Sequence, residues 1–144
     1  MISQTAEYAL RAVVHLASVD QSGTTSQTTQ QIADATQVPV GYLSKVLQGL
    51  SRAGVIASQR GLGGGWSLSR AAAAISVFDV VQPVDPIRRI EECPLGLEAH
   101  GTALCPLHRS LDEAAANLEK SFRETTIAIL IANPSSAALC VGPQ

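Results

Sequence analysis

A glycine-rich segment constrains this chain more than any other feature of its sequence. Four of the five residues between Arg60 and Trp66 are glycine, and the exception is Leu62. The runs 55–59 and 66–70 on either side have strand character, so the segment predicts the tip of a β-hairpin. Because glycine has no Cβ, backbone N–H groups at such a tip can approach a phosphate closely. An arginine beside them favours insertion into a narrow minor groove, and an ordinary flexible hairpin is the alternative.

Two helices are predicted near the start of the chain. Ser3 can cap the first, which runs to about residue 19 with apolar residues at helical spacing. Residues 20–30 are rich in Ser, Thr, Gln and Gly, which is typical of a loop. Thr28 and Gln31 have the spacing of a capping box, which predicts a short second helix.

A third helix with two distinct faces precedes the hairpin. Pro39 suits its first position, where the missing N–H costs nothing, and Gly54 suits a left-handed cap at its end. Its apolar face contains Leu43, Val46, Leu47 and Leu50. Its small or polar face contains Gly41, Ser44, Lys45 and Gln48. A short helix, a tight turn and a two-faced helix together predict a helix-turn-helix.

The second half of the chain is predicted to form a loop followed by a long helix. Residues 75–81 suit another short helix, and residues 83–106 are loop-like. From Leu107 to about Ala132 apolar residues advance in steps of three and four, and an Asn-Pro step ends the run. A helix of about 25 residues is about 38 Å long, too long for this chain to cover. Its apolar stripe therefore predicts a homodimer.

These elements define the fold class and divide the chain into four parts. We expect a mainly α fold with a small β-hairpin. The parts are a winged helix-turn-helix DNA-binding domain over 1–82, a ligand-binding loop over 83–106, a dimerisation helix over 107–133 and a flexible tail over 134–144.

The composition is compatible with a folded DNA-binding protein. The chain is 46% hydrophobic and 15% charged, so it can build a core. Its net charge of −2 is uneven: residues 1–70 carry five basic and three acidic side chains, and residues 71–144 carry five and nine. The first half can therefore present a weakly basic face. No apolar run approaches ~20 residues and no secretory signal is visible, so we expect a cytoplasmic protein with no membrane partner.

Two cysteines, Cys93 and Cys105, are each followed by proline, and His108 lies one turn beyond the second. Three cysteines in a chain of this kind favour metal or redox chemistry over a disulfide framework. A Cys-Pro step also permits haem ligation by thiolate, and a mononuclear metal is a further alternative. Structural zinc is disfavoured because the chain has no CxxC pair. Cys140 lies in the C-terminal tail and is interpreted as incidental.

Several segments together resemble the Rrf2 family of bacterial winged-helix regulators, which includes iron–sulfur and nitric-oxide-sensing members. The likeness extends over roughly residues 1–132 and is carried by 6–12, Ile32-Ala33, Tyr42-Leu43, Leu50 with Gly54, and 60–68. It implies a homodimer whose long C-terminal helices cross, with a recognition helix in the major groove and a wing at the minor groove. It also implies a transcription regulator, more often a repressor. We do not expect an enzyme, since nothing supplies an oxyanion hole or orienting group for a nucleophile–base pair.

Many members of this family hold an iron–sulfur cluster on a loop with three cysteines spaced C-x5-C-x5-C, sometimes followed by a histidine. Cys93 and Cys105 match the outer cysteines and His108 matches the histidine. The middle position is Ala99, which cannot ligate, although His100 lies beside it. The resemblance therefore implies a cluster site with an altered ligand set.

Two thiolates with nitrogen or carboxylate ligands favour a 2Fe–2S cluster over a 4Fe–4S cluster. For the fourth ligand, Glu7 occupies the position where some family members offer an acidic ligand from the partner subunit, and His100 competes with it. An i,i+4 ion pair with Arg11 is the alternative for Glu7. A cluster-free regulator that senses redox state through its thiols, or one controlled by a partner protein, also stays open.

The expected DNA contacts lie on the polar side of the third helix, at the start of the second helix and in the wing. They are Thr28, Tyr42, Ser44, Lys45, Gln48, Arg60, Gly61 and Gly63. The alternative for the helix residues is that they are only solvated. We expect a change at the ligand loop to move the long helix and alter the spacing of two recognition helices.

Overall fold

The computed structural model describes residues 2–24, 26–98 and 103–133, which form a mainly helical fold with one antiparallel hairpin. In chain order its elements are α1 (Gln4–Gln21), α2 (Thr29–Thr36), α3 (Val40–Arg52), β1 (Ile56–Gln59), β2 (Gly65–Leu68), the 3₁₀ turn η1 (Ala72–Ala74), α4 (Val77–Val81), α5 (Pro106–Glu124) and α6 (Ile127–Ala132). The predicted fold class is confirmed. The predicted tail 134–144 lies outside the described residues.

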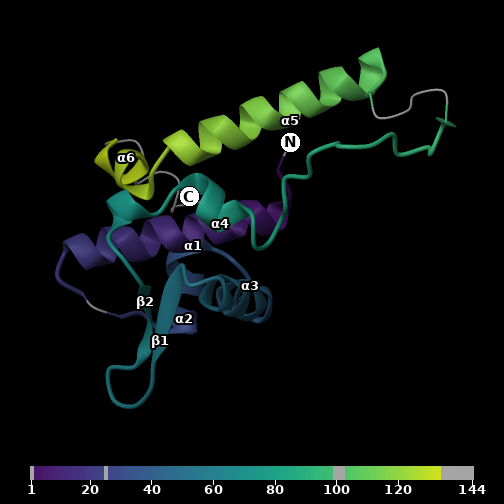
Figure 1. Cartoon of the computed structure of the whole chain (residues 1–144). Helices are drawn as coiled ribbons and strands as arrows, with labels where there is room; N and C mark the ends of the chain where they lie inside the picture. Colours follow the sequence, from purple (N-terminus) through teal and green to yellow (C-terminus); the bar gives the residue numbers. More distant parts are fainter. Residues whose placement is uncertain (1, 25, 99–102, 134–144) are drawn as a thin grey trace.

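Helix α1 is the centre of the fold (Figure 1). Ser3 caps it as predicted, because its side chain accepts a hydrogen bond from Ala6 N at 3.2 Å. Helices α2 and α3 and strand β2 pack on one side of α1, and α4 and α6 pack on the other. Four of the seven residues on its buried face are alanine, and the full set is Ala6, Ala9, Ala12, Val13, Val14, Leu16 and Ala17. Alanine side chains allow neighbouring elements to approach closely, so α1 can pack against elements on both of its sides.

Helices α2 and α3 form the predicted helix-turn-helix. Thr28 and Gln31 make both hydrogen bonds of a capping box at the start of α2, as predicted. Pro39 precedes α3 as its cap, so the helix begins one residue later than predicted. The apolar face of α3 is buried as predicted: Leu43, Val46, Leu47 and Leu50.

The hairpin follows α3 after a turn at Gly54, whose φ of 76° confirms the predicted left-handed cap. Strands β1 and β2 pair antiparallel, and Gln59 opposite Gly65 is the pair nearest the tip. The strands are shorter than the predicted runs. At their base, Ser69 N still donates a hydrogen bond of 3.1 Å to Val55 O.

The predicted single helix over 107–133 is wrong, because the chain breaks it into α5 and α6 at Thr125 and Thr126. Thr125 has extended backbone, with φ −94° and ψ 112°, and its carbonyl accepts a hydrogen bond of 2.8 Å from Val77 N. Thr126 caps α6 and forms an isolated β-bridge with Ser76. These bonds to the start of α4 replace helical ones, and β-branched threonine has a low intrinsic preference for the helix.

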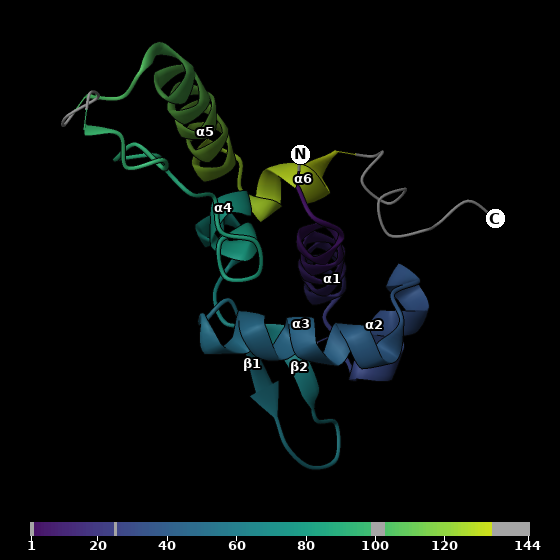
Figure 2. The ribbon, with the colours of Figure 1, turned by 90° about the vertical axis from the view of Figure 1, so that its right-hand side faces the viewer.

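Helix α6 turns back onto α1, whereas α5 extends away from the body (Figure 1, Figure 2). Ile127 is fully buried in the main core. The 19 residues of α5 span about 28 Å, and none of them is buried. Leu107 is 63% exposed and Leu111 49%, so an apolar stripe on α5 is uncovered in the single chain. No helix among the described residues is long and apolar enough to cross a membrane.

We predict that Ile127→Ala lowers the free energy of unfolding by about 2–5 kcal/mol and that Ile127→Val lowers it by about 0.5–1.5 kcal/mol. The reason is that Ile127 anchors α6 in the core, so its loss leaves a cavity beside α1. Urea unfolding followed by circular dichroism measures both values. An Ile127→Ala protein as stable as wild type would mean that α6 does not dock on the body.

Candidate nucleic-acid interface and ligand loop

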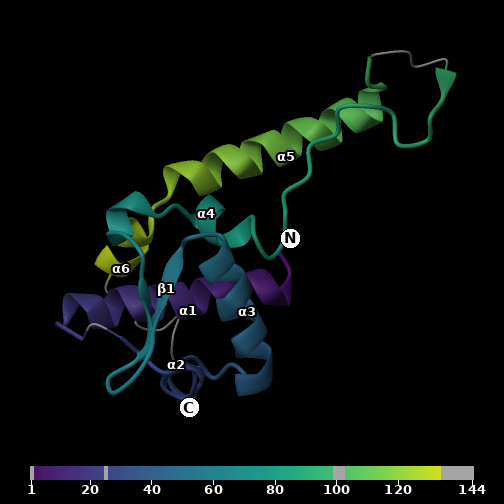
Figure 3. The same cartoon turned by 60° about the horizontal axis from the view of Figure 1, so that its bottom comes forward.

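Helix α3 and the hairpin lie next to each other, on the other side of α1 from α4 and α6 (Figure 2, Figure 3). Lys45 and Gln48 are exposed on α3, and Arg60 is exposed at the hairpin. Among the described residues, no carboxylate forms an ion pair with Lys45 or Arg60. The two cationic groups are therefore available to an anionic ligand such as the phosphate backbone of DNA.

Tyr42 and Ser44 also lie on α3 but are engaged within the protein. Ser44 Oγ donates a hydrogen bond of 3.1 Å to Val40 O. The Tyr42 hydroxyl makes a short hydrogen bond with Thr5 Oγ1, and its ring meets the Tyr8 ring edge-on with centroids 5.5 Å apart. Tyr42 thus fastens the start of α3 to α1, a role that the sequence pattern did not indicate.

Thr28 lies at the start of α2, and its hydroxyl accepts a hydrogen bond of 3.2 Å from Gln31 N. A hydroxyl that accepts in a helix cap can also donate, so this position stays compatible with a phosphate contact. In the hairpin, Gly61 and Gly63 have φ of 94° and 75°. Glycine adopts this left-handed backbone readily, which explains why these positions carry no side chain.

The segment between α1 and α2 forms an additional edge for the hairpin. Gln27 and Trp66 exchange backbone hydrogen bonds of 2.9 and 2.7 Å. Ser26 Oγ donates to Gly63 O at 2.6 Å, and the Trp66 indole N–H donates to Thr29 Oγ1 at 3.0 Å. The sequence reasoning missed this anchor. The single tryptophan after the glycine run was the available signal, because a partly buried indole N–H needs an acceptor.

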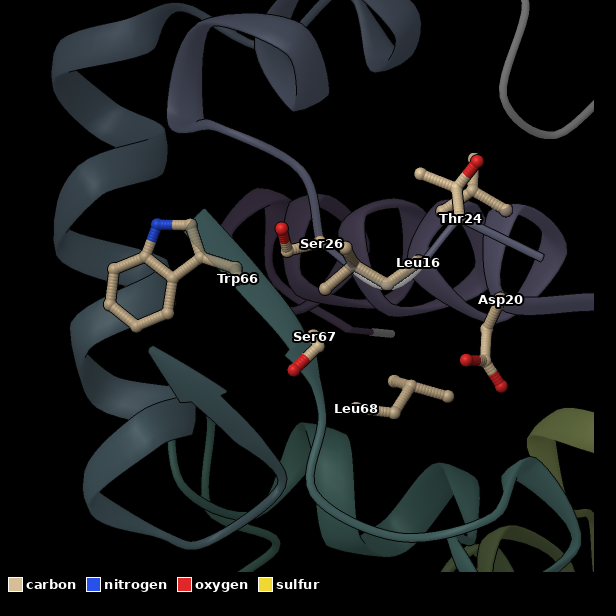
Figure 4. A pocket seen from close by; sticks show the side chains of 8 residues that line it. Leu16, Asp20, Thr24, Ser26, Trp66, Ser67 and Leu68 are labelled. Carbon is tan, nitrogen blue, oxygen red and sulfur yellow. The ribbon is translucent and has the colours of Figure 1, made fainter. Parts of the chain in front are cut away.

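A narrow recess lies behind this anchor (Figure 4). It is too tight to admit a water molecule, so it is packing space rather than a ligand site. Apolar and polar side chains from α1, the following loop and β2 line it: Leu16, Val19, Asp20, Thr24, Ser26, Trp66, Ser67 and Leu68.

Cys105 and His108 form a pair at the start of α5. Cys105 is the cap residue, and His108 lies in the first turn of the helix. Cys105 Sγ lies 3.2 Å from His108 Nδ1. This separation suits two donors that share one metal ion, and sulfur with imidazole nitrogen is a donor set found at iron–sulfur centres. The pair therefore fits the predicted ligand chemistry.

The other two predicted ligands do not join this pair in the single chain. Among the described residues, no three His, Cys, Asp or Glu side chains lie close enough to hold one metal ion. Cys93 is half-buried on the loop before α5. Glu7 lies on α1, where its carboxylate pairs with Arg11 at 2.8 Å, so the ion-pair alternative is present. His100 lies outside the described residues.

The loop that carries Cys93 runs along α5 (Figure 1). A bidentate ion pair between Arg89 and Asp112 joins the loop to this helix. Arg89 donates two hydrogen bonds to Asp112, of 2.7 and 2.6 Å, and Ile90 N donates a third of 2.8 Å. The Arg89 side chain and the Ile90 amide lower the pKa of Asp112 from 3.8 to about 2. Closer to the body, Ser3 N donates to Asp85 Oδ2 at 2.8 Å, which ties the loop to the start of α1.

Helix α5 is joined to α4 at its opposite end. The Arg123 guanidinium stacks on the Phe78 ring, 3.6 Å from its centroid, while Glu119 pairs with the same guanidinium at 2.8 Å. A cation over an aromatic face is a stabilising contact, a modest one here because the Arg123 side chain stays 55% exposed. The angle at which α5 leaves the body is therefore fixed by this contact and by the bonds of Thr125.

A two-faced α3, a short capped α2 and an anchored glycine-rich hairpin define a winged helix-turn-helix DNA-binding protein. Residues 2–133 match the family model Rrf2, which is described as an iron-dependent transcriptional regulator. The chain belongs to the Rrf2 family, and it is a transcription regulator rather than an enzyme, as predicted.

Solved structures of other regulators share the fold. CymR (YrzC), the global cysteine regulator of B. subtilis, matches with a TM-score of 0.73 at 22% identity over 92% of this chain and 96% of that chain. IscR from T. potens matches with a TM-score of 0.76 at 20% identity over 99% and 93%. The oxidised form of Staphylococcus aureus CymR matches with a TM-score of 0.71 at 24% identity over 92% and 97%. At these identities the likeness establishes the fold.

We predict that Gly65→Ala destabilises the protein more than Gly61→Ala, by at least about 1 kcal/mol. Both glycines have positive φ, but a Cβ at Gly65 would overlap the Gln27 carbonyl, whereas one at Gly61 would meet nothing within 4 Å. Thermal unfolding of the two variants measures the difference. Equal losses would contradict the close approach of the hairpin to residue 27.

We predict that the Asp112 carboxylate stabilises the folded chain above about pH 3.8 and that this contribution is lost as the pH falls through about 2. The folded pKa is depressed, so protonation of Asp112 favours the unfolded state. Consequently, the difference in unfolding free energy between wild type and Asp112→Asn should be largest above pH 3.8, should shrink as the pH falls to about 2, and should vanish only below that pH. Urea unfolding at a series of pH values measures it.

A difference that is constant with pH would contradict the ion pair with Arg89. The matched control is Arg89→Gln, which removes the partner. In the Arg89→Gln protein, Asp112→Asn should lower the free energy of unfolding by less than it does in wild type. The reason is that the two substitutions break the same interaction.

Proposed function

We propose that this Rrf2-family regulator is a homodimeric repressor that binds a double-stranded DNA operator and is controlled by an iron–sulfur cluster. In this proposal α3 enters the major groove, where Lys45, Gln48 and Ser44 meet base edges and phosphates. Thr28 and Tyr42 contact the phosphate backbone. Arg60, Gly61 and Gly63 meet the minor groove. The observation that carries this part is the exposure of Lys45 on α3 and of Arg60 directly after the adjacent strand β1, neither of which pairs with a carboxylate among the described residues.

The apolar stripe of α5 supports the dimer. Leu107 and Leu111 stay exposed in the single chain, and a second copy can cover them by crossing of the two helices. A two-fold dimer would present two recognition helices to half-sites about 34–36 Å apart. Operator affinity would then depend on the angle between each α5 and its winged-helix body.

The Cys105–His108 pair supports a metal centre at the start of α5. Cys93 on the adjacent loop would supply a second thiolate, and Glu7 of the partner subunit or His100 the remaining donor. With two thiolates, we infer a 2Fe–2S rather than a 4Fe–4S cluster. Such a centre, when bound, supplies reversible one-electron chemistry and sensitivity to iron, oxidants and nitric oxide.

The contacts of the loop offer a route from this site to DNA. Asp112 and Asp85 fix the loop to α5 and α1, so a loop that closes on a ligand pulls on both helices. Because Tyr42 ties α1 to the start of α3, a shift of α1 reaches the recognition helix. A coupling of about 1–3 kcal/mol would change operator affinity about 5- to 150-fold.

A cluster-free thiol sensor is the second candidate. The short distance between Cys105 Sγ and His108 Nδ1 favours it, because a neighbouring imidazole can assist thiol chemistry. The structural likeness to CymR, one form of which was solved oxidised, points in the same direction. Haem binding through a Cys-Pro thiolate is a third possibility, with a distinct optical spectrum.

We predict that protein purified without oxygen shows the optical and Mössbauer signature of a 2Fe–2S cluster. Cys93→Ser and Cys105→Ser should lose the signature, and His108→Ala should weaken or shift it. Cys140→Ser is the matched control and should keep it, since the proposal gives that thiol no role. Mössbauer spectroscopy with iron analysis measures the cluster type and its occupancy.

Colourless, iron-free protein that loses operator binding on reversible thiol oxidation would favour the thiol sensor. A Soret band would favour haem. Either result would contradict the cluster while leaving DNA binding untouched.

A further inference from the structure

We infer that Leu62, at the tip of the hairpin, reads the floor of the DNA minor groove and selects against a guanine 2-amino group there. The inference rests on the proposed function, because it requires that the hairpin enters the minor groove. Leu62 is fully exposed at 108%, well above Leu95 at 72%, the next large apolar side chain in the described part of the chain. A single exposed leucine is ordinary on a protein surface. Its position at the end of a DNA-reading hairpin makes it informative.

The tip is a compact turn that displays one side chain. Gly64 N donates to Gly61 O at 2.9 Å, which places Leu62 second and Gly63 third in a four-residue turn. The φ of 75° at Gly63 is what a type II turn requires at its third residue. A Cβ on Gly64 would lie 2.7 Å from Gln59 O, so the backbone itself fills that side of the turn. Leu62 is therefore the only residue between Arg60 and Trp66 that presents more than backbone.

The tip is also held in place before any ligand arrives. Ser26 Oγ donates to Gly63 O, next to Leu62. At the base of the hairpin, Trp66 bonds to Gln27 and Thr29. A tip that is already ordered loses little conformational entropy on binding, so a small apolar contact can alter affinity.

The hydrogen-bonding groups on the floor of the minor groove indicate which base pair Leu62 would disfavour. Its floor shows only acceptors at A·T pairs, whereas guanine adds a 2-amino donor. A leucine over that amino group would remove its water without replacing the hydrogen bond, and an unpaired donor is costly. Apolar wedges, leucine among them, recur in proteins that enter the minor groove. Arg60 supplies attraction to the groove, and Leu62 supplies the discrimination between base pairs.

The test uses a duplex selected by the wild-type protein from a random pool, with the base pair under the tip located by footprinting. That pair is varied among A·T, G·C, inosine·C and diaminopurine·T, which add or remove the 2-amino group without relocating the site. Wild type should bind A·T and inosine·C alike, and bind G·C and diaminopurine·T about tenfold more weakly. Leu62→Ala should bind all four within about twofold, while Leu62→Met should keep the wild-type pattern.

Arg60→Ala separates this inference from the proposed function. It should weaken binding to all four duplexes and keep the ratio between them. If Leu62→Ala still discriminates against the 2-amino group, the inference is overturned and the hairpin still binds DNA. If neither Arg60→Ala nor Leu62→Ala changes affinity, the minor-groove role of the hairpin fails as well. Both side chains are exposed, so thermal unfolding should match wild type and exclude misfolding as the cause.

Discussion

The close packing of five elements on the alanine-rich face of α1 is the constraint on which the rest of the structure depends. Ala6, Ala9 and Ala12 are completely buried, and no larger side chain could keep its neighbours so near. Since α3 and β2 pack on one side of α1 and α4 and α6 on the other, α1 connects the helix-turn-helix and the hairpin to the two short helices that flank the loop and α5. Close-packed interiors change between discrete arrangements rather than deform smoothly. In the proposed function, a movement of the ligand loop shifts α1, and the contacts of α1 transmit that shift to α3.

The helix-turn-helix could be predicted from the sequence because local signals specify each boundary. Ser3, Thr28 with Gln31, and Gly54 occupy the cap positions that their side chains or backbone favour, and the structure confirms all of them. The break between α5 and α6 could not be predicted in the same way. The apolar period continues through Thr125, and the bonds that end α5 come from Ser76 and Val77, which are distant in the sequence. Long-range pairing overrides a local period when it satisfies the same backbone groups.

The candidate site was predictable to the extent that it depends on spacing within one element. An i,i+3 spacing at the start of a helix brings Cys105 and His108 together, whereas Cys93 and Glu7 belong to other elements and stay apart from them. For the anchor of the hairpin, Trp66 signalled that its indole N–H needs an acceptor, but the partners in residues 26–29 could not be identified because Ser26 and Gln27 lie in a segment without periodicity. The Arg89–Asp112 pair was also missed, because the two residues are 23 positions apart and meet only when the loop lies along α5. Spacing along the sequence therefore predicted the Cys105–His108 pair, whereas contacts between distant segments became visible only in the structure.

The most direct measurement of the central claim is the operator affinity of one anaerobic preparation before and after its iron is removed by a chelator. If metal bound at the start of α5 changes the position of α3 in the dimer, the two affinities should differ at least about fivefold. Restoring iron and sulfide should restore the first value. Equal operator affinities of the untreated, iron-free and reconstituted protein would contradict this control of DNA binding, even if a cluster is present and the protein binds its operator tightly.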